Sequence, residues 1–335
     1  MIETSGIRAP DKGVHDTRSG SSVRAGNARP GAHLLVGAVD GHVHACPHLN
    51  ARSVDVFDAV EQAAGAGMLG IGLMDNFCSS VGYAALARRR LGHLGVDVFG
   101  GVILEPQAGG LSPDVVRAAL GTGYPDGEVR HPADGARFVS LPTHHTRAVA
   151  LAEGRDAAYV DACLAIPERG PLPDALARIV DLVAAHDVVL NTGHLTAAET
   201  LRLVELAKAA GVTRILTPAN YFDAADVRAL TALGACVEFS FFFVSHATQV
   251  GLTHVDAEKH AVDPITLPRM VELIAAAPAS QVVLSGDCGV SVLPPPVEGL
   301  REFLWALRIS GVAETTLRRA AGENPARLFR VARPA

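Results

Sequence analysis

The sequence predicts a (β/α)8 barrel, in which eight parallel strands alternate with eight helices. From Leu34 onward, a short apolar run is followed by polar or glycine-rich residues and then by an amphipathic stretch rich in Ala and Leu, and this unit occurs eight times. The strand runs are continuously apolar, which is typical of parallel strands that are buried on both faces. An open, doubly wound sheet is the alternative, but no GxGxxG motif follows the first strand.

Each element is expected from its own stretch of sequence. The expected strands are the eight apolar runs Leu35–His44, Met68–Met74, Val96–Leu104, Arg137–Leu141, Val188–Asn191, Arg214–Thr217, Ala235–Ser240 and Gln281–Ser285. The expected helices are the eight amphipathic stretches Val54–Ala66, Tyr83–Leu94, Pro113–Leu120, Leu172–His186, Ala197–Ala210, Ala224–Leu233, Leu267–Ala277 and Val297–Ile309. Two connections, Pro142–Gly170 and Phe241–Pro264, are long, and we expect both at the carboxyl end of the barrel, where barrel active sites lie.

Composition narrows the class of protein. Hydrophobic residues make up 49% of the 335 residues and charged residues 19%, which is typical of a folded chain rather than a disordered one. The net charge of −6 and the absence of clustered positive charge argue against nucleic acid as a partner. No run of about 20 apolar residues predicts a membrane helix. The five cysteines contain no CxxC pair, which argues against a disulfide framework or a thiolate zinc site.

The first 33 residues are rich in Gly, Ser, Arg and Asp and show no periodic apolar pattern. They are interpreted as a flexible tail, and residues 34–335 as a single barrel domain. The tail has no apolar core like that of a secretory signal, and together with the unpaired cysteines this favours the cytoplasm. The expected partner is a small-molecule substrate, and a homo-oligomer is left open.

Two histidines end the first expected strand. Because side chains alternate between the faces of a strand, His42 and His44 share one face, which in a barrel can be the lumen. Two imidazoles that converge there suit a divalent metal ion. The alternative is a pair of unrelated strand histidines, but their position at the end of the first strand favours the metal site.

An acidic residue follows the last expected strand. Asp287 comes after Ser285 and Gly286, and closure of a barrel makes the first and eighth strands neighbours. Asp287 can therefore reach a metal held by His42 and His44, and a carboxylate there can both bind the metal and take a proton from bound water. The alternative is an Asp that caps the next helix or closes a turn.

A third histidine ends the fifth expected strand. Gly193 permits close approach of the backbone, and His194 would then face the mouth of the barrel. Thr196 is expected to cap the following helix, with Glu199 completing a capping box. His194 is either a structural loop histidine or the third imidazole of a His3Asp metal site.

Six further residues are candidates for contact with the substrate, and for each the alternative is ordinary loop, capping or solvated-surface chemistry. They are Arg52, Glu105, His144, His145, Asn220 and Glu238. Glu238 ranks above the others because a carboxylate in an apolar strand is costly to bury without a partner. Arg52, shortly after the histidine pair, is a candidate anchor for an anion.

These motifs, in this order, resemble the amidohydrolase superfamily of metal-dependent hydrolases, and more closely an uncharacterised amidohydrolase-like group within it. The likeness spans roughly residues 35–330. The matching stretches are Asp40–Pro47 with Arg52, Phe99–Val102 with Gly109–Leu111, Leu141–Thr143, Asn191–Leu195, Ser285–Asp287 and Glu323–Ala326.

The resemblance implies a barrel that binds one or two divalent metal ions and activates a water for attack on an amide, ester or related bond. The metal roles carry over to His42, His44, His194 and Asp287, with Asp287 also the general base. The superfamily often has a histidine at the end of the sixth strand, and many binuclear members have a lysine on the fourth; this chain has neither. One metal is therefore favoured over two. Zinc is the expected ion, with Mn, Fe, Co and Ni as alternatives.

The chain is therefore interpreted as a metal-dependent hydrolase of a small polar or anionic substrate, oriented by Arg52 and by His144 or His145. One alternative is a metal-dependent lyase such as a decarboxylase. The other is a degenerate barrel that acts as a non-catalytic binding protein, which the missing sixth-strand histidine supports.

Overall fold

Eight parallel strands form the centre of the computed structural model, which describes residues 29–124, 134–219, 221–250, 252–253, 259–260 and 263–332. The strands are β1 (Val39–Val43), β2 (Gly70–Leu73), β3 (Asp97–Ile103), β4 (Phe138–Ser140), β5 (Val189–Asn191), β6 (Ile215–Pro218), β7 (Cys236–Ser240) and β10 (Val282–Ser285). Hydrogen-bonded ladders join them in the order β1-β2-β3-β4-β5-β6-β7-β10, and every ladder is parallel. A parallel bridge between Val43 and Cys288 brings β1 next to β10, so the sheet is a nearly closed barrel. The predicted (β/α)8 fold is confirmed.

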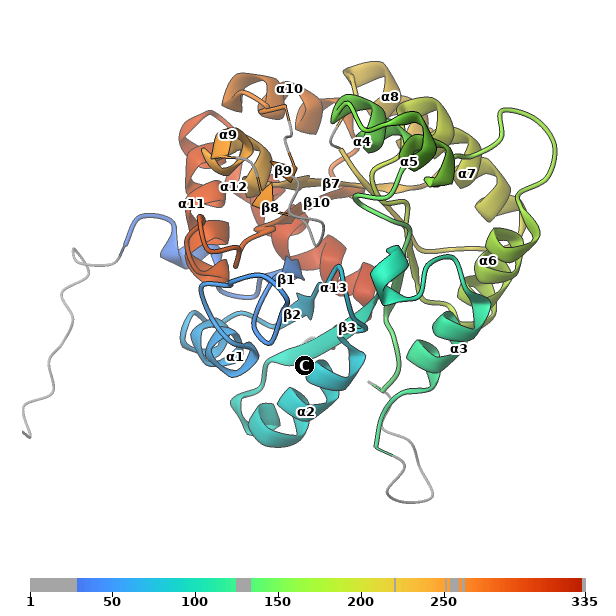
Figure 1. Ribbon diagram of the computed structural model, residues 1–335. Coiled ribbons are helices and arrows are strands. Elements are labelled where there is room, and N and C mark those ends of the chain that lie inside the picture. Colours follow the sequence, from blue (N-terminus) through green and yellow to red (C-terminus); the bar gives the residue numbers. More distant parts are fainter. Residues whose placement is uncertain are drawn as a thin grey trace, which may run out of the picture. The chain divides into compact units, whose positions relative to one another are not determined.

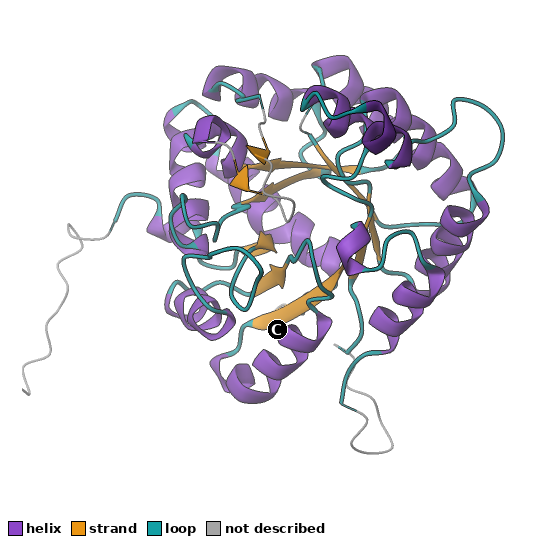
Figure 2. Cartoon of the chain, in the orientation of Figure 1, coloured by secondary structure: helices purple, strands orange, loops and turns teal. Residues whose placement is uncertain are grey.

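Helices cover the outside of this ring, as Figures 1 and 2 show. Those that follow the strands are α1 (Val56–Gly65), α2 (Val81–Leu91), α3 (Pro113–Gly121), α6 (Asp174–His186), α7 (Ala197–Ala209), α8 (Ala224–Ala232), α10 (Leu267–Ala276) and α11 (Pro296–Ile309). Capping boxes begin several of them. In α7, the Thr196 side chain accepts from the backbone N–H of Glu199 and the Glu199 side chain accepts from that of Thr196, as predicted.

The strand positions are buried on both faces, which explains their continuous apolar runs. Outward-facing residues such as Ile71 and Val237 pack against the helices, whereas inward-facing residues such as Phe99, Phe138 and Val283 fill the barrel. The first strand is shorter than predicted. Ala32–Leu34 form a 3-10 helix, and β1 begins only at Val39.

Both long connections contain short elements. The first holds α4 (Arg147–Ala152) and α5 (Ala157–Ala162). The second holds the 3-10 helix η4 (Phe241–Val244), α9 (Ala247–Val250) and the paired strands β8 (Leu252–Thr253) and β9 (Lys259–His260). None of these elements was predicted, because each is too short to show a hydrophobic period.

The chain ends in α12 (Glu314–Arg318), a π-helical turn η5 (Arg319–Glu323) and α13 (Asn324–Phe329), which sequence periodicity also missed. In Figure 1, α13 appears within the ring of strands. Phe329 stacks on Phe99 inside the barrel, with ring centroids 4.8 Å apart. Arg137 and Arg214, which precede β4 and β6, donate to carbonyl groups of α13. The helix therefore closes the amino end of the barrel.

The barrel and its helices belong to one compact unit, Gly31–Ala335. Of the tail predicted for residues 1–33, residues 1–28 lie outside the described part of the chain, and residues 32 and 33 belong to the 3-10 helix before β1. Among the described helices, none combines the length and the apolar character that crossing a membrane requires.

Candidate metal centre

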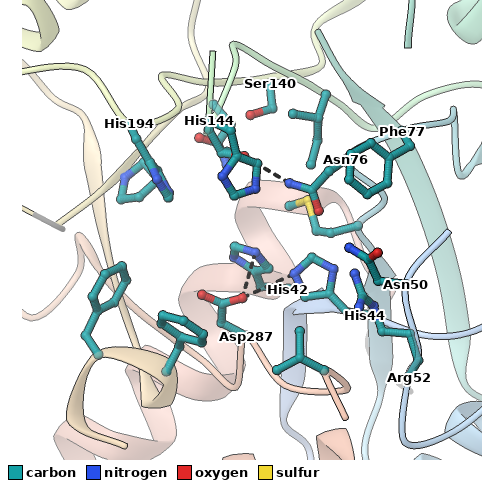
Figure 3. Close-up of a pocket in the computed structure, with 18 of the residues that line it drawn as sticks. His42, His44, Asn50, Arg52, Asn76, Phe77, Ser140, His144, His194 and Asp287 are labelled. Atoms are coloured by element: carbon teal, nitrogen blue, oxygen red, sulfur yellow. Dashed lines mark hydrogen bonds and ion pairs between the residues drawn. The ribbon is translucent and has the colours of Figure 1, made fainter. Parts of the chain in front are cut away.

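Three of the four predicted metal ligands converge at the carboxyl end of the barrel. His42 is the next-to-last residue of β1, His44 follows the strand, and Asp287 follows β10 (Figure 3). The Nε2 atoms of His42 and His44 each lie 3.2 Å from Oδ1 of Asp287. The ligand atoms of the three residues all lie within 4.8 Å of one another. The alternation of β1 aims both imidazoles into the lumen, as predicted.

Asp287 does not cap a helix. The N-cap of α11, the next helix, is Pro295. Instead, Asp287 adopts the left-handed conformation with φ 49°, an unusual state for a residue with a side chain, and such states are often kept at functional sites. Its second oxygen, Oδ2, accepts a long hydrogen bond of 3.4 Å from the hydroxyl of Ser240.

Glu238 lies on β7 behind His42. Its Oε1 is 3.3 Å from Nδ1 of His42, on the side of the imidazole that faces away from Asp287, and its side chain is 3% exposed. A histidine that binds a metal through Nε2 is usually oriented by such a second partner at Nδ1. Glu238 is not among the residues that line the cavity described below, and the partner that its buried carboxylate was expected to need is His42.

This donor set fits a divalent metal ion. Atoms about 2.0–2.1 Å from a tetrahedral Zn²⁺ lie roughly 3.3–3.4 Å apart, and both Nε2–Oδ1 distances here are 3.2 Å. Two imidazole nitrogens and a carboxylate oxygen also suit several other transition metals. The carboxylate at Nδ1 of His42 supplies the outer hydrogen bond that metal-ligating histidines commonly make.

Burial and the neighbouring charges shift the pKa values of all three candidate ligands. Burial alone would lower the pKa of His42, but the charges of Asp287 and Glu238 outweigh it and raise that pKa to about 10. Burial lowers the pKa of His44 despite its contact with Asp287. Burial would raise the pKa of Asp287, but the charge of His42 and the hydrogen bond with His44 hold it below its usual value, so Asp287 is ionised near neutral pH.

A further carboxylate below the ligands, Asp40 on β1, was not predicted as a site residue. It is 1% exposed, and its oxygens accept from the backbone N–H groups of His42 and Gly286. Burial raises its pKa to about 7. Simple alternation could not have placed it, because the pairing of β1 is irregular between Asp40 and Val43, and Val39 and Gly41 face the cluster that fills the barrel.

The three ligands lie in a cavity of about 350 Å³ at the carboxyl end of the barrel. One part of its wall is polar, with Arg52, amides and hydroxyl groups, and another part is apolar. The polar lining includes Asn50, Arg52, Asn76, Ser140, Thr143 and Asn191, and the apolar lining includes Met74, Phe77, Ile103, Phe242, Phe243 and Val290. Thr143, Phe242 and Phe243 come from the two long connections, which were predicted to reach this end.

His194 and His144 also line the cavity (Figure 3). Gly193, with φ 63°, packs so closely on the carbonyl group of Pro142 that a Cβ atom would overlap it, and this turn carries His194 to the mouth. The charge of His194 contributes to lowering the pKa of Asp287. His194 nevertheless lies outside the group of three convergent ligands.

Arg52 lines the cavity and is fixed by neutral partners. Its guanidinium donates to the carbonyl oxygen of Ala51 at 3.0 Å, and its Nη2 lies 2.8 Å from Nε2 of His48, whose Nδ1 accepts from the backbone N–H of Asn50 at 3.0 Å. Among the described residues, no carboxylate lies within 4.0 Å of it, and burial lowers its pKa to about 10. The side chain of His48 is completely buried, and burial lowers its pKa to about 3, so the imidazole is neutral. His48 was not predicted as a site residue.

Two other predicted substrate contacts are corrected. Glu105 is 1% exposed and accepts hydrogen bonds from Thr143, His144 and His145, so it holds the loop after β4 rather than a ligand. The His145 side chain turns toward α5, with Nε2 3.2 Å from the carbonyl oxygen of Ala162. Neither residue lines the cavity. The prediction for Asn220 lies outside the described residues.

Residues 37–238 match a family model described as Family of unknown function (DUF6282). No curated protein has a significantly similar sequence.

Solved structures resemble the fold over 90% of the chain. An amidohydrolase from Pseudomonas aeruginosa has a TM-score of 0.57 at 10% identity, with 99% of its own chain covered. A mutant of organophosphorus hydrolase from Deinococcus radiodurans has a TM-score of 0.55 at 14% identity, with 95% covered. A mutant of a PTE-like lactonase from the same organism has a TM-score of 0.52 at 14% identity, with 98% covered. At these identities the likeness shows a shared (β/α)8 fold.

Proposed function

Because the chain belongs to the Family of unknown function (DUF6282) and folds as an amidohydrolase-type barrel, we propose that it is a metal-dependent hydrolase. The observation that carries this proposal is the meeting of two imidazoles and one carboxylate at 3.2 Å, at the end of the barrel where active sites lie. His42, His44 and Asp287 would hold one divalent ion, for which zinc is the first candidate. His194, at the same mouth, is the candidate for a fourth ligand.

When bound, a divalent cation would lower the pKa of a water molecule and polarise the bond under attack. Residues of the chain would accept the proton and orient the ligands. Asp287 is ionised near neutral pH, and its Oδ2, the oxygen that neither imidazole approaches, would accept the proton of the attacking water. Glu238 holds the His42 ring in place through Nδ1.

The wall of the cavity suggests the substrate. Arg52 lines the cavity and forms no ion pair within the described residues, although the charges of Asp75 and Asp287 act on it, so we infer that it binds an anionic group or a strongly polar oxygen. His144, beside Thr143, would orient the same substrate, while Phe242 and Phe243 offer an apolar surface. A volume of about 350 Å³ admits a small molecule only.

The first experiment measures metal content in the purified chain. We expect about one ion per chain, and we expect the double variant His42→Ala with His44→Ala to lose it while keeping its helical circular dichroism. Two exposed histidines far from the cavity, His93 and His186, provide the matched control as a double alanine variant. A wild type that takes up no divalent ion, or a ligand variant that retains full occupancy, overturns the metal assignment.

The second experiment asks which bond is broken. Structural neighbours described as amidohydrolase, organophosphorus hydrolase and lactonase suggest a panel of amides, phosphotriesters, lactones and simple esters, each with and without a carboxylate. Turnover in H₂¹⁸O distinguishes the reactions, because hydrolysis places solvent oxygen in the product and decarboxylation releases CO₂ instead. A metal-loaded chain that releases CO₂ would replace the hydrolase by the lyase.

A further inference from the structure

The two strands that carry the candidate ligands are weakly joined. Every other neighbouring pair of barrel strands shares a ladder, but within the described residues β1 and β10 share none along their lengths. Within the described residues, their backbones are joined at one bridge, between Val43 at the end of β1 and Cys288 beyond β10, where the N–H of His44 donates to the Cys288 carbonyl at 2.9 Å. The relative position of His42 and Asp287 therefore depends on contacts other than a ladder.

The carboxylate of Asp40 bridges the junction between β1 and β10, which we call the β1–β10 seam. On its own strand, Oδ1 accepts from the backbone N–H of His42 at 3.0 Å. Across the seam, Oδ2 and Oδ1 accept from the backbone N–H of Gly286 at 3.1 and 3.2 Å. His42 is itself a candidate ligand, and Gly286 directly precedes Asp287. One side chain thus fixes the backbone beside a ligand on each strand.

The chain on the β10 side is adapted to this contact. A Cβ atom on Gly286 would lie 2.8 Å from Oδ2 of Asp40, closer than real Cβ atoms approach a neighbour. Only glycine lets the backbone N–H come this near to the carboxylate. The next residue, Asp287, then enters the left-handed region, and this turn directs its side chain toward the imidazoles.

Stability alone does not explain a carboxylate in this place. Asp40 is 1% exposed, and removing a carboxylate from water is costly even when backbone N–H groups replace the solvent. An apolar side chain at this position would avoid that cost. The polar contact across the seam therefore points to a role in placing the ligands.

We propose that Asp40 is a positioning residue, whose carboxylate sets the distance across the β1–β10 seam so that His42 and His44 meet Asp287. This inference rests on the proposed metal site. Removing the carboxylate should let the seam relax and should weaken metal binding. Loss of a group that orients metal ligands typically lowers metal affinity about 10–100-fold.

The test is a titration of the full-length chain, stripped of metal by a chelator, with Zn²⁺. Asp40→Ala should bind about 10–100-fold more weakly than wild type. Asp40→Asn should recover part of the lost affinity, because one amide oxygen at the position of Oδ1 can accept from both His42 and Gly286, while its amide nitrogen then faces the Gly286 N–H. Gly286→Ala, which presses on the carboxylate from the opposite strand, should weaken binding in the same direction and serves if Asp40→Ala does not fold.

Asn324→Ala is the matched control for stability. The Asn324 amide donates to the carbonyl groups of Ala279 and Val282, at the other end of β10 from the ligands. This variant should unfold at a lower temperature but bind Zn²⁺ like wild type. Equal affinity in wild type, Asp40→Ala and Gly286→Ala overturns the inference alone, as does equal weakening by Asn324→Ala. A wild type without affinity for Zn²⁺ or another divalent ion overturns the proposed function and this inference with it.

Discussion

The loop that carries Thr143 and His144 into the cavity depends on a single buried carboxylate. Oε1 of Glu105 accepts from the N–H groups of Thr143 and His144, both at 2.7 Å, and from the Thr143 hydroxyl at 3.1 Å. Oε2 accepts from the N–H of His145 at 3.1 Å. In Glu105→Gln the amide oxygen can keep the three bonds of Oε1, but the amide nitrogen faces the N–H of His145.

The expected loss of stability follows from this count. A hydrogen bond to a charged group contributes about 1.5–3 kcal/mol, so Glu105→Gln should lower the free energy of unfolding by about that amount. Glu105→Ala leaves three backbone N–H groups without this acceptor, and each unsatisfied buried donor costs about 1–3 kcal/mol. The alanine variant should therefore lose at least about 3 kcal/mol.

Urea unfolding curves measure both changes as shifts of the midpoint at constant slope. Asp114→Asn provides the control, because the Asp114 side chain is 90% exposed and its ion pair with Arg117 should contribute little. Metal content should remain that of wild type, since the candidate ligands lie on other strands. A Glu105→Gln variant within about 0.5 kcal/mol of wild type, less than one such hydrogen bond contributes, would show that the loop is held in some other way.

Three further outcomes are expected. Asp287→Asn should retain metal more weakly and lose turnover by about 10²–10⁴-fold, because an amide cannot accept the proton of water; near-wild-type turnover would remove Asp287 from the mechanism. Arg52→Gln should raise KM roughly 10–100-fold for anionic substrates and much less for neutral ones, and equal effects on both would argue against an anion contact. Phe329→Ala should cost about 3–5 kcal/mol in calorimetry or urea unfolding, because the ring is 1% exposed and fills the barrel; a stability equal to wild type would show that the amino end does not depend on it.

The barrel could be predicted because its strands are short, apolar and regularly spaced. The observed β5, Val189–Asn191, and β10, Val282–Ser285, each lie within the predicted run and begin one residue later. Alternation along one strand was enough to place His42 and His44 together. Closure of the barrel then brought Asp287 to them, as the prediction required.

The partners of the buried carboxylates could not be predicted in the same way. Sequence showed that Glu238 needs a partner, but only the closed barrel shows that the partner is His42. Glu105 looked like a strand-end residue of the mouth, yet the loop after β4 folds back over it. Asp40 reads as part of a turn until the opposite strand is in place. Such roles depend on contacts between residues far apart in the chain.

The position of α13 affects how small molecules reach and leave the cavity. Phe329 and Phe99 fill the amino end of the barrel, so among the described residues the cavity is closed on that side, and a ligand would enter and leave at the carboxyl end. A bound product would then block the entry of the next substrate. For the proposed hydrolase, product should therefore act as a competitive inhibitor, and release of product is expected to limit the rate of turnover.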